Sequence, residues 1–300
     1  MPERTFTCFG GACTVLVEGD GAAEALIATR DEMLAWHEVF TRFKPESELS
    51  RLNADRRECV PVSPLMARFA AAAVAAAEAT GGLVDPTLLE EIEEVGYRSD
   101  RLRGTLALPM ALALTPHRAA AGPHPDARWR AMQVDLDAGT ITRPPGVKLD
   151  GGGIVKGLCA DVMAESLDGS FAINCEGDLR VGGAERAIQV ASPFDGAVLH
   201  QFAIGDGGVA TSEIAKRSWL GAGTRPAHHL LDPATGRPAY TGVVQATALA
   251  PTALEGEALA KAAVLSGPEG AAAWLPHGGV LVFDDGSHAV VDELSRAARS

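Results

Sequence analysis

Positive charge is scarce in this sequence. Its 300 residues contain 26 lysines and arginines but 39 aspartates and glutamates, so the formal net charge is −13. An acidic surface of this kind repels nucleic acid and anionic membranes, which argues against both as partners. An anionic ligand such as a dinucleotide then needs a local cluster of basic side chains or backbone N–H groups.

The chain also lacks the patterns of zinc knuckles, thioredoxins and membrane spans. No two cysteines have Cys-x-x-Cys spacing, and most are predicted to be small core residues in a reducing compartment. The first ten residues have no apolar segment of the signal-peptide kind, and the alanine-rich run at 70–77 is too short to span a bilayer. These absences predict a cytoplasmic protein without membrane insertion, and they predict nothing about its oligomeric state. The cysteines are Cys8, Cys13, Cys59, Cys159 and Cys175.

The two commonest nucleotide-binding loops, Walker A and Gly-x-Gly-x-x-Gly, are absent as well. In their place the sequence has Asp150-Gly-Gly-Gly-Ile-Val-Lys156-Gly157, directly before a predicted helix. Three glycines allow the backbone to approach a ligand closely, and a helix N-terminus with a neighbouring lysine suits a phosphate. On spacing alone, an ordinary strand-to-helix turn with a solvated lysine is the simpler interpretation.

Hydrophobic periodicity predicts strands with helices interspersed, which is typical of an α+β domain. We expect a strand over 5–17 bent at Gly10-Gly11, a polar segment over 42–53, and strands and loops over 90–145. No linker divides the chain, so one domain over residues 1–300 is expected. The predicted helices cover 22–43, 63–80, 154–167 and 255–265, and the other predicted strands cover 171–175, 179–181, 187–191, 198–204, 243–250 and, as the last, 279–283.

Three further segments can carry chemistry, and each also has a structural interpretation. The polar segment from Asn174 to Asp178 is either a ligand-binding turn or a hairpin connection. His228 and His229 are neighbours on a predicted strand, so they face opposite sides and cannot easily share a metal, which suits one ligand contact and one structural histidine. Glu257 and Lys261 are spaced for an ion pair along one helix face.

In their order along the chain, these segments resemble the ApbE family of flavin transferases, from about Phe9 to Phe283. The match is loosest at the first segment and at Glu176, where the family pattern has a glycine. The segments that carry the resemblance are Phe9-Gly10-Gly11, Phe43 with Pro45 to Asn53, Val84-Asp85-Pro86-Thr87, Asp150 to Gly157 with Asp161, Asn174 to Gly183, Ala210-Thr211-Ser212 and His229 to Gly236.

The resemblance implies a single α+β domain, with mixed or antiparallel sheets and helices packed around a central FAD cleft. It also implies an activity, the transfer of FMN from FAD to a Thr or Ser hydroxyl of an acceptor protein, with release of AMP and with Mg²⁺ at the diphosphate. Asp178 and His229 are the implied catalytic residues, with His229 or a nearby acid taking the hydroxyl proton. The implied FAD-binding residues are Phe9, Phe43, Leu83, Val84, Asp85, Asp150, Gly152, Gly153, Lys156, Asp178, Thr211, Ser212, His229 and Leu230.

The implied magnesium site departs from the family pattern. The family holds the ion with an Asp and a Thr four residues apart on a late helix and with one backbone carbonyl. In this sequence those positions are Glu257, Lys261 and Val155. A glutamate can still ligate the ion, but a charged lysine has no lone pair and repels it. The hypothesis that follows is that Lys261 replaces the cation, pairs with Glu257 and contacts the FAD diphosphate.

The altered metal positions leave two alternatives to transfer open. One is an FAD-binding protein without transferase activity, such as a carrier or a sensor. The other is an FAD pyrophosphatase, in which water replaces the acceptor hydroxyl, although a weakened metal site also disfavours hydrolysis.

Overall fold

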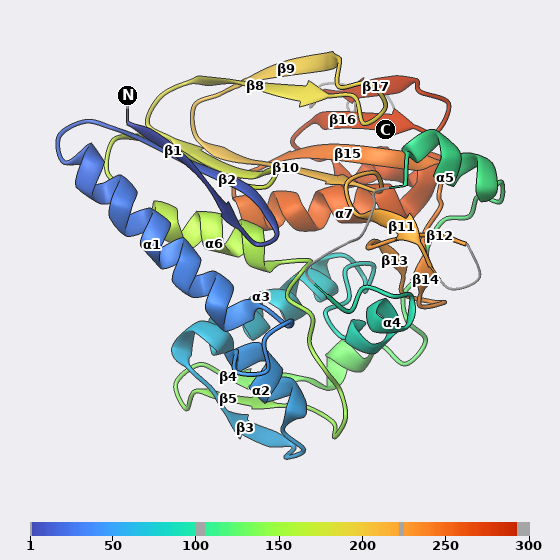
Figure 1. Ribbon diagram of the computed structural model, residues 1–300, viewed down its shortest axis with the longest axis horizontal. Coiled ribbons are helices and arrows are strands. Elements are labelled where there is room, and N and C mark those ends of the chain that lie inside the picture. Colours follow the sequence, from blue (N-terminus) through green and yellow to red (C-terminus); the bar gives the residue numbers. More distant parts are fainter. Residues whose placement is uncertain (1, 100–105, 222–224, 293–300) are drawn as a thin grey trace.

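The computed structural model of the chain describes residues 2–99, 106–221 and 225–292. Its centre is an eight-stranded sheet in the order β1-β2-β6-β7-β10-β15-β16-β17, in which every neighbouring pair is antiparallel (Figure 1). The expected α+β fold with antiparallel sheets is therefore confirmed. The strands are β1 Glu3–Cys8, β2 Gly11–Glu18, β6 Ser170–Cys175, β7 Asp178–Gly182, β10 Gly207–Glu213, β15 Val243–Ala250, β16 Gly279–Phe283 and β17 His288–Val291.

Helices cover one face of this sheet and a hairpin covers the other (Figure 1). Helices α1 (Ala22–Phe40), α6 (Val155–Ala164) and α7 (Ala253–Gly270) pack on the first face. On the second face, the hairpin of β8 (Arg186–Ala191) and β9 (Val198–Ile204) places Ile188 and Ile204 against Leu179, Val181 and Val209. The strands alternate between these two apolar layers, which is why β2 and β6 show period-two burial.

Helix α6 packs closely on α7. A Cβ on Gly157 would lie 2.7 Å from the carbonyl oxygen of Ala253, so only glycine allows this approach. The carboxylate of Asp161 on α6 accepts hydrogen bonds from the N–H groups of Ala253 and Leu254, each at 2.9 Å. The first turn of α7 is thus capped by a side chain of α6.

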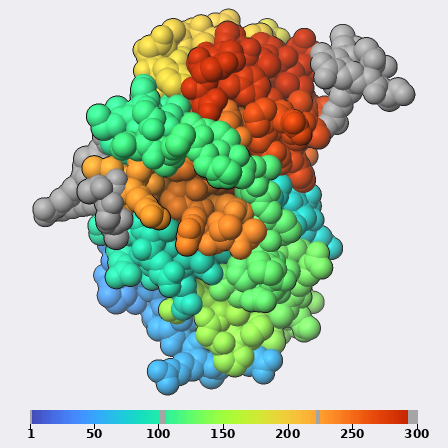
Figure 2. Space-filling model, turned by 90° about the vertical axis from the view of Figure 1, so that its right-hand side faces the viewer, coloured from blue at the N-terminus to red at the C-terminus, as the bar shows by residue number. Residues whose placement is uncertain are grey.

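A helical part lies at the opposite end of the molecule from the β8–β9 hairpin (Figure 2). It contains α2 (Glu48–Ala54), α3 (Pro64–Ala79) and a small sheet of β3 (Cys59–Pro61), β5 (Thr140–Thr142) and β4 (Gln133–Asp135). Helix α3 begins as predicted, with Pro64 in its first turn and the hydroxyl of Ser63 accepting from the N–H of Met66 at 3.1 Å.

A third group of short elements flanks the sheet and the helical part. It consists of α4 (Leu89–Glu94), α5 (Leu108–Leu114), the 3-10 helices η1 (Arg128–Ala131) and η3 (Ala271–Trp274), and two short hairpins. The hairpins are β11 (Ser218–Leu220) with β12 (Pro226–His228) and β13 (Leu231–Asp232) with β14 (Arg237–Pro238). Within the described part of the chain, no helix has both the length and the apolarity needed to cross a membrane.

Several sequence predictions about elements were wrong, most of them at turns. The expected bent strand over 5–17 is two antiparallel strands, because Phe9 and Gly10 have φ of 53° and 83° and form a tight two-residue turn. Residues 90–145 hold helices as well as strands, since α4 and α5 lie there. Helix α1 ends at Phe40, three residues earlier than expected, and α7 extends to Gly270 across a kink at Gly267.

Several short elements were missed, and so were one helix and two strands of the central sheet. The polar segment over 42–53 contains α2, which begins where the Ser47 hydroxyl accepts from the N–H of Ser50 at 3.0 Å. Strand β10 lies in the middle of the central sheet, and β17 follows β16, which is therefore not the last strand. The other predicted helices and strands are confirmed to within a few residues.

Candidate functional site

Two adjoining pockets lie where the β1–β2 turn, the glycine turn before α6 and the chain before β13 meet. The larger one, the apolar pocket, encloses about 1230 Å³ including its open mouth, and the smaller one, the charged pocket, encloses about 400 Å³. Five residues line both, so the two pockets form one continuous site. These residues are Gly152, Lys156, Arg217, His229 and Lys261.

Phe43 and Tyr97 give the apolar pocket an aromatic wall, and Trp219 packs against Tyr97 outside the pocket lining. The ring centroid of Tyr97 lies 5.6 Å from that of Phe43 and 5.6 Å from that of Trp219. The guanidinium of Arg42 lies 4.5 Å from the Phe43 centroid and 4.7 Å from the Tyr97 centroid. Phe9, Leu83, Val84 and Leu230 also line the pocket. Such a slot suits a planar aromatic ligand.

One acceptor in the apolar pocket has no partner. Oδ1 of Asp85 accepts from the N–H of Thr87 at 2.8 Å and from its hydroxyl at 2.6 Å. Oδ2 of the same carboxylate is buried without a hydrogen bond among the described residues. Because a buried polar atom without a partner costs about 1–3 kcal/mol, a ligand N–H that reached Oδ2 would remove that cost.

The glycine turn is ordered by Asp150. Its Oδ2 accepts from the N–H of Gly152 at 3.2 Å, and its Oδ1 lies 3.3 Å from Nε of Arg42. The turn leads directly into α6, so Gly152, Gly153 and the first N–H groups of the helix border the pocket. A helix N-terminus beside Lys156 favours an anion.

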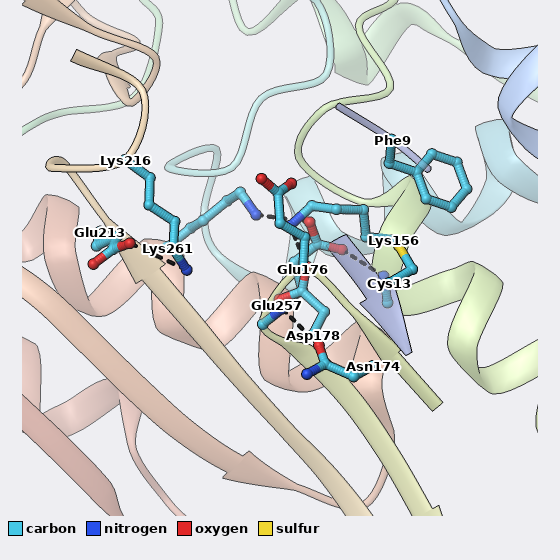
Figure 3. Close-up of polar contacts among 12 residues, drawn as sticks. Phe9, Cys13, Lys156, Asn174, Glu176, Asp178, Glu213, Lys216, Glu257 and Lys261 are labelled. Carbon is cyan, nitrogen blue, oxygen red and sulfur yellow. Dashed lines mark hydrogen bonds and ion pairs between the residues drawn. The ribbon is translucent and has the colours of Figure 1, made fainter. Parts of the chain in front are cut away.

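The charged pocket is surrounded by four basic side chains, each paired with one carboxylate, and Figure 3 shows the three lysines among them. Two of the carboxylates lie behind their partners, since the Asp178 side chain is 1% exposed and the Glu257 side chain 0%. The pairs are Lys156 with Asp178 at 2.5 Å, Lys261 with Glu257 at 2.9 Å, Lys216 with Glu213 at 3.2 Å, and Arg217 with Glu176.

The pair of Arg217 and Glu176 joins distant segments. Arg217 also donates to the carbonyl oxygen of Phe9 at 3.1 Å, which ties it to the β1–β2 turn. Glu176 occupies the β6–β7 turn with φ of 58°, a conformation that is strained for a residue with a side chain. The segment from Asn174 to Asp178 is therefore a hairpin connection, and its residue Glu176 also lines the charged pocket.

Burial and neighbouring charge set the ionisation of these groups. Burial, with the nearby Glu257 carboxylate, raises the pKa of Asp178 to about 6, although the ammonium of Lys156 opposes the shift. For Glu257, burial acts to raise the pKa, but the ammonium groups of Lys261 and Lys156 outweigh it and hold the pKa below its usual value. Burial and the charge of Arg217 hold the pKa of His229 well below 6.5, so its imidazole is neutral at pH 7.

The two neighbouring histidines differ as the sequence suggested. His229 lines both pockets, and its Nδ1 has no hydrogen-bond partner among the described residues. His228 is fully buried against the ring of Tyr240, with centroids 4.7 Å apart, and lines neither pocket. One faces the site and the other is structural.

Every predicted FAD-binding residue except Asp178 lines one of the two pockets, and Asp178 lies directly behind Lys156. Thr211 and Ser212 on β10 belong to the charged pocket. Of the predicted metal positions, Val155 and Lys261 line the apolar pocket and Glu257 lies behind Lys261. The pocket residues that sequence reasoning missed include Arg42, Tyr97, Glu213, Lys216 and Arg217. Two adjacent basic residues, Lys216 and Arg217, are unusual in so acidic a chain and could have indicated an anion-binding site.

Comparisons with known proteins agree with the resemblance seen in the sequence. The model of the ApbE family matches residues 9–283. The FAD:protein FMN transferase of Treponema pallidum is 28% identical over 311 residues, covering 91% of this chain and 81% of that protein. The enzyme of the same name from Salmonella typhimurium is 25% identical over 300 residues, covering 94% and 83%. The crystal structure of the ApbE protein from Thermotoga maritima superposes with a TM-score of 0.78 at 24% identity, covering 99% of this chain and 98% of that one.

Proposed function

Because this chain belongs to the ApbE family, we propose that it is an FAD:protein FMN transferase, which moves FMN from FAD to a Thr or Ser hydroxyl of an acceptor protein and releases AMP. The observation that carries the proposal is the two-part site, an aromatic slot joined to a charged pocket by shared residues. FAD has the matching shape, with a flat, largely apolar ring system connected to a diphosphate. The family relatives named for this activity align along most of the chain.

The apolar pocket is proposed to hold the isoalloxazine ring. Phe43 and Tyr97 offer aromatic faces, and Leu83 and Val84 add apolar walls. The unpartnered Oδ2 of Asp85 can accept the single N–H of that ring system, which gives the pocket one directional contact. Burial of the ring in this slot supplies most of the affinity.

The charged pocket and the start of α6 are proposed to hold the diphosphate. Lys156 and Lys261 come from α6 and α7 and approach the same region (Figure 3). Each ammonium has three N–H donors and its carboxylate accepts one of them, so donors remain for phosphate oxygens. Thr211 and Ser212 add hydroxyl groups at the edge of the same pocket.

The transfer step is a displacement at the phosphorus of the FMN half of FAD. The acceptor hydroxyl oxygen forms a bond to that phosphorus, the bond from phosphorus to the bridging oxygen breaks, and AMP leaves with the bonding electron pair. We assign the removal of the hydroxyl proton to His229, because its imidazole is neutral and its Nδ1 is without a partner. The charges of Arg217, Lys261 and Lys156 also lower the pKa of His229. A bound diphosphate would neutralise these charges, so the imidazole would be a stronger base in the complex. Asp178 is proposed to position Lys156.

Magnesium does not fit the residues at the position that the family implies. Both carboxylate oxygens of Glu257 are engaged, one by the ammonium of Lys261 and one by the N–H of Gly157 at 2.8 Å. Across the described residues, no group of three His, Cys, Asp or Glu side chains is arranged to hold a metal ion. Because the ammonium of Lys261 also adds a positive charge there, we derive no step of the transfer through a metal.

The acceptor and the location belong to the proposal as well. We expect a protein acceptor that presents a Thr or Ser hydroxyl at the mouth of the charged pocket. We also propose that the reaction takes place in the cytoplasm, which the free state of all five cysteines supports.

A transfer assay tests the proposal. The purified protein is mixed with FAD and a peptide carrying an acceptor Thr, and the intact mass is measured, with the same peptide carrying Ala as control. A gain of one FMN on the Thr peptide alone, with AMP released, is expected. Saturable FAD binding without an adduct would instead support the binding protein, for which the fully engaged Glu257 is the favouring observation. Release of FMN and AMP without an adduct would support the pyrophosphatase.

A further inference from the structure

Lys261 presents a fixed ammonium at the junction of the two pockets. Its side chain is 10% exposed, and its Nζ lies 2.9 Å from Oε1 of Glu257, one turn earlier on α7. Lys261 lines both pockets, whereas Glu257 is fully buried and lines neither. The ammonium therefore lies on the ligand side of the pair and the carboxylate on the protein side.

Both carboxylate oxygens of Glu257 are engaged, and one of them holds the ammonium of Lys261. Oε2 accepts from the N–H of Gly157 at 2.8 Å, and this contact depends on the close approach of α6 and α7. One carboxylate oxygen is bonded to Lys261 on α7 and the other to Gly157 on α6. The carboxylate therefore cannot turn toward a metal ion without leaving a buried N–H and a buried ammonium unpaired. A divalent cation at this point would also meet the charge of Lys261 directly.

The other basic groups of the charged pocket are arranged in the same way. Lys156 lies in front of Asp178, and Arg217 is held by Glu176 and by the carbonyl oxygen of Phe9. Three cations from separate elements thus converge on one region, each oriented by a carboxylate. Such oriented donors bind an anion without an added ion, because the positive ends of the pairs face the ligand.

We infer that Lys261, held by Glu257, takes the place of a divalent cation at the FAD diphosphate, so that this chain binds FAD without magnesium. The inference rests on the proposed function, since it assumes that FAD is the ligand. It concerns binding, which can be measured whether or not transfer is efficient.

The first test is a calorimetric titration of FAD into the full-length protein after EDTA treatment, once in EDTA and once in millimolar Mg²⁺. The two dissociation constants are expected to agree within about twofold. An affinity that falls tenfold or more in EDTA overturns the inference and leaves the proposed function standing. Absence of FAD binding under both conditions overturns the proposed function and the inference with it.

Variants of Lys261 test the residue itself. Lys261→Met keeps the length of the side chain and removes the charge, and it is expected to weaken FAD binding in EDTA about 10- to 100-fold, the usual effect of losing a charge-assisted hydrogen bond. Lys148→Met is the matched control, because Lys148 pairs with Glu90 at 2.9 Å away from both pockets and should bind FAD like the wild type. Wild-type affinity in Lys261→Met would overturn the inference.

A double variant guards against a failure to fold. Glu257→Gln with Lys261→Met removes both buried charges and keeps an acceptor for the N–H of Gly157, and it should show the same loss of FAD affinity. A second double variant, Glu257→Asp with Lys261→Thr, has the family's residues at these positions. FAD binding by that variant is expected to become dependent on Mg²⁺, and binding as tight in EDTA as that of the wild type would contradict the role given to Lys261.

Discussion

The apolar pocket and the charged pocket share part of their lining, yet their walls are stabilised in different ways. Phe43 and Tyr97 in the first are ordered by ring contacts and by the guanidinium of Arg42 between them. In the second, each basic group is ordered by one carboxylate, and two of those carboxylates are buried. Packing contacts can be lost one at a time at modest cost. Removing one member of a buried ion pair leaves a charge without compensation, so the charged pocket is the more fragile half.

The sharpest test of this contrast is the loss of a buried carboxylate. Glu257→Ala is expected to lower the free energy of unfolding by about 3–5 kcal/mol, because it leaves the ammonium of Lys261 and the N–H of Gly157 without their hydrogen-bond partner. Urea unfolding at pH 7 measures it. Glu255→Ala on the same helix is the control, since Glu255 is exposed and pairs with the exposed His277, and it should cost less than about 1 kcal/mol. Equal losses in the two variants would remove the distinction.

The interior behind the site is expected to respond to pH through His228. Burial lowers the pKa of His228 to about 3, from 6.5 when it is exposed. The unfolded chain therefore binds a proton between pH 6.5 and pH 3 that the folded chain does not, so stability is lost as the pH falls through this range. The expected slope from this group is up to about 1.4 kcal/mol per pH unit, or roughly 2 kcal/mol between pH 6.5 and pH 5.

Replacement of this histidine isolates its contribution. Unfolding of the wild type and of His228→Gln is compared from pH 7.5 to pH 5, where the variant is expected to have the flatter profile. Parallel profiles would mean that His228 is already protonated in the folded protein or is exposed to water.

On the apolar side, Phe43→Ala is expected to weaken FAD binding about tenfold while changing stability little, because the Phe43 side chain is only half-buried in the free protein. Fluorescence titration with FAD measures the affinity, and Phe43→Tyr, which keeps the ring, is the control. A loss of stability as large as that from Glu257→Ala would show that the two pockets are not held differently.

The smallest effect is expected at Asp85, whose unpartnered oxygen lines the apolar pocket. Asp85→Asn keeps an oxygen for Thr87 but presents a donor in place of the unpartnered Oδ2, so FAD affinity should fall about three- to tenfold. Riboflavin, which has the ring system but no diphosphate, should lose affinity by the same factor. A loss for FAD alone would place Asp85 at the diphosphate instead.

Sequence patterns located about half of the pocket lining but few of its contacts. The turn from Asp150 to Gly157 and the pair of His228 and His229 were recognisable because each is local, and its conformation follows from neighbouring residues. The interactions of Arg217 were not, because they join residues 9, 176 and 217 across three turns. Strand β10 was also missed, since its glycines and small residues have little strand propensity and form a strand only between β7 and β15.

By itself, the sequence determined the alternation of helices and strands, the glycine turn before α6 and the spacing that brings Lys261 onto the same helix face as Glu257. These features depend on backbone periodicity and on the conformational range of individual residues, which nearby sequence controls. Only the tertiary structure decided that Gly157 would engage the second oxygen of Glu257 and that four basic side chains would face one pocket. Those contacts depend on how closely α6 approaches α7 and on which turns meet at the sheet edge, and both are set by packing between segments far apart in the chain.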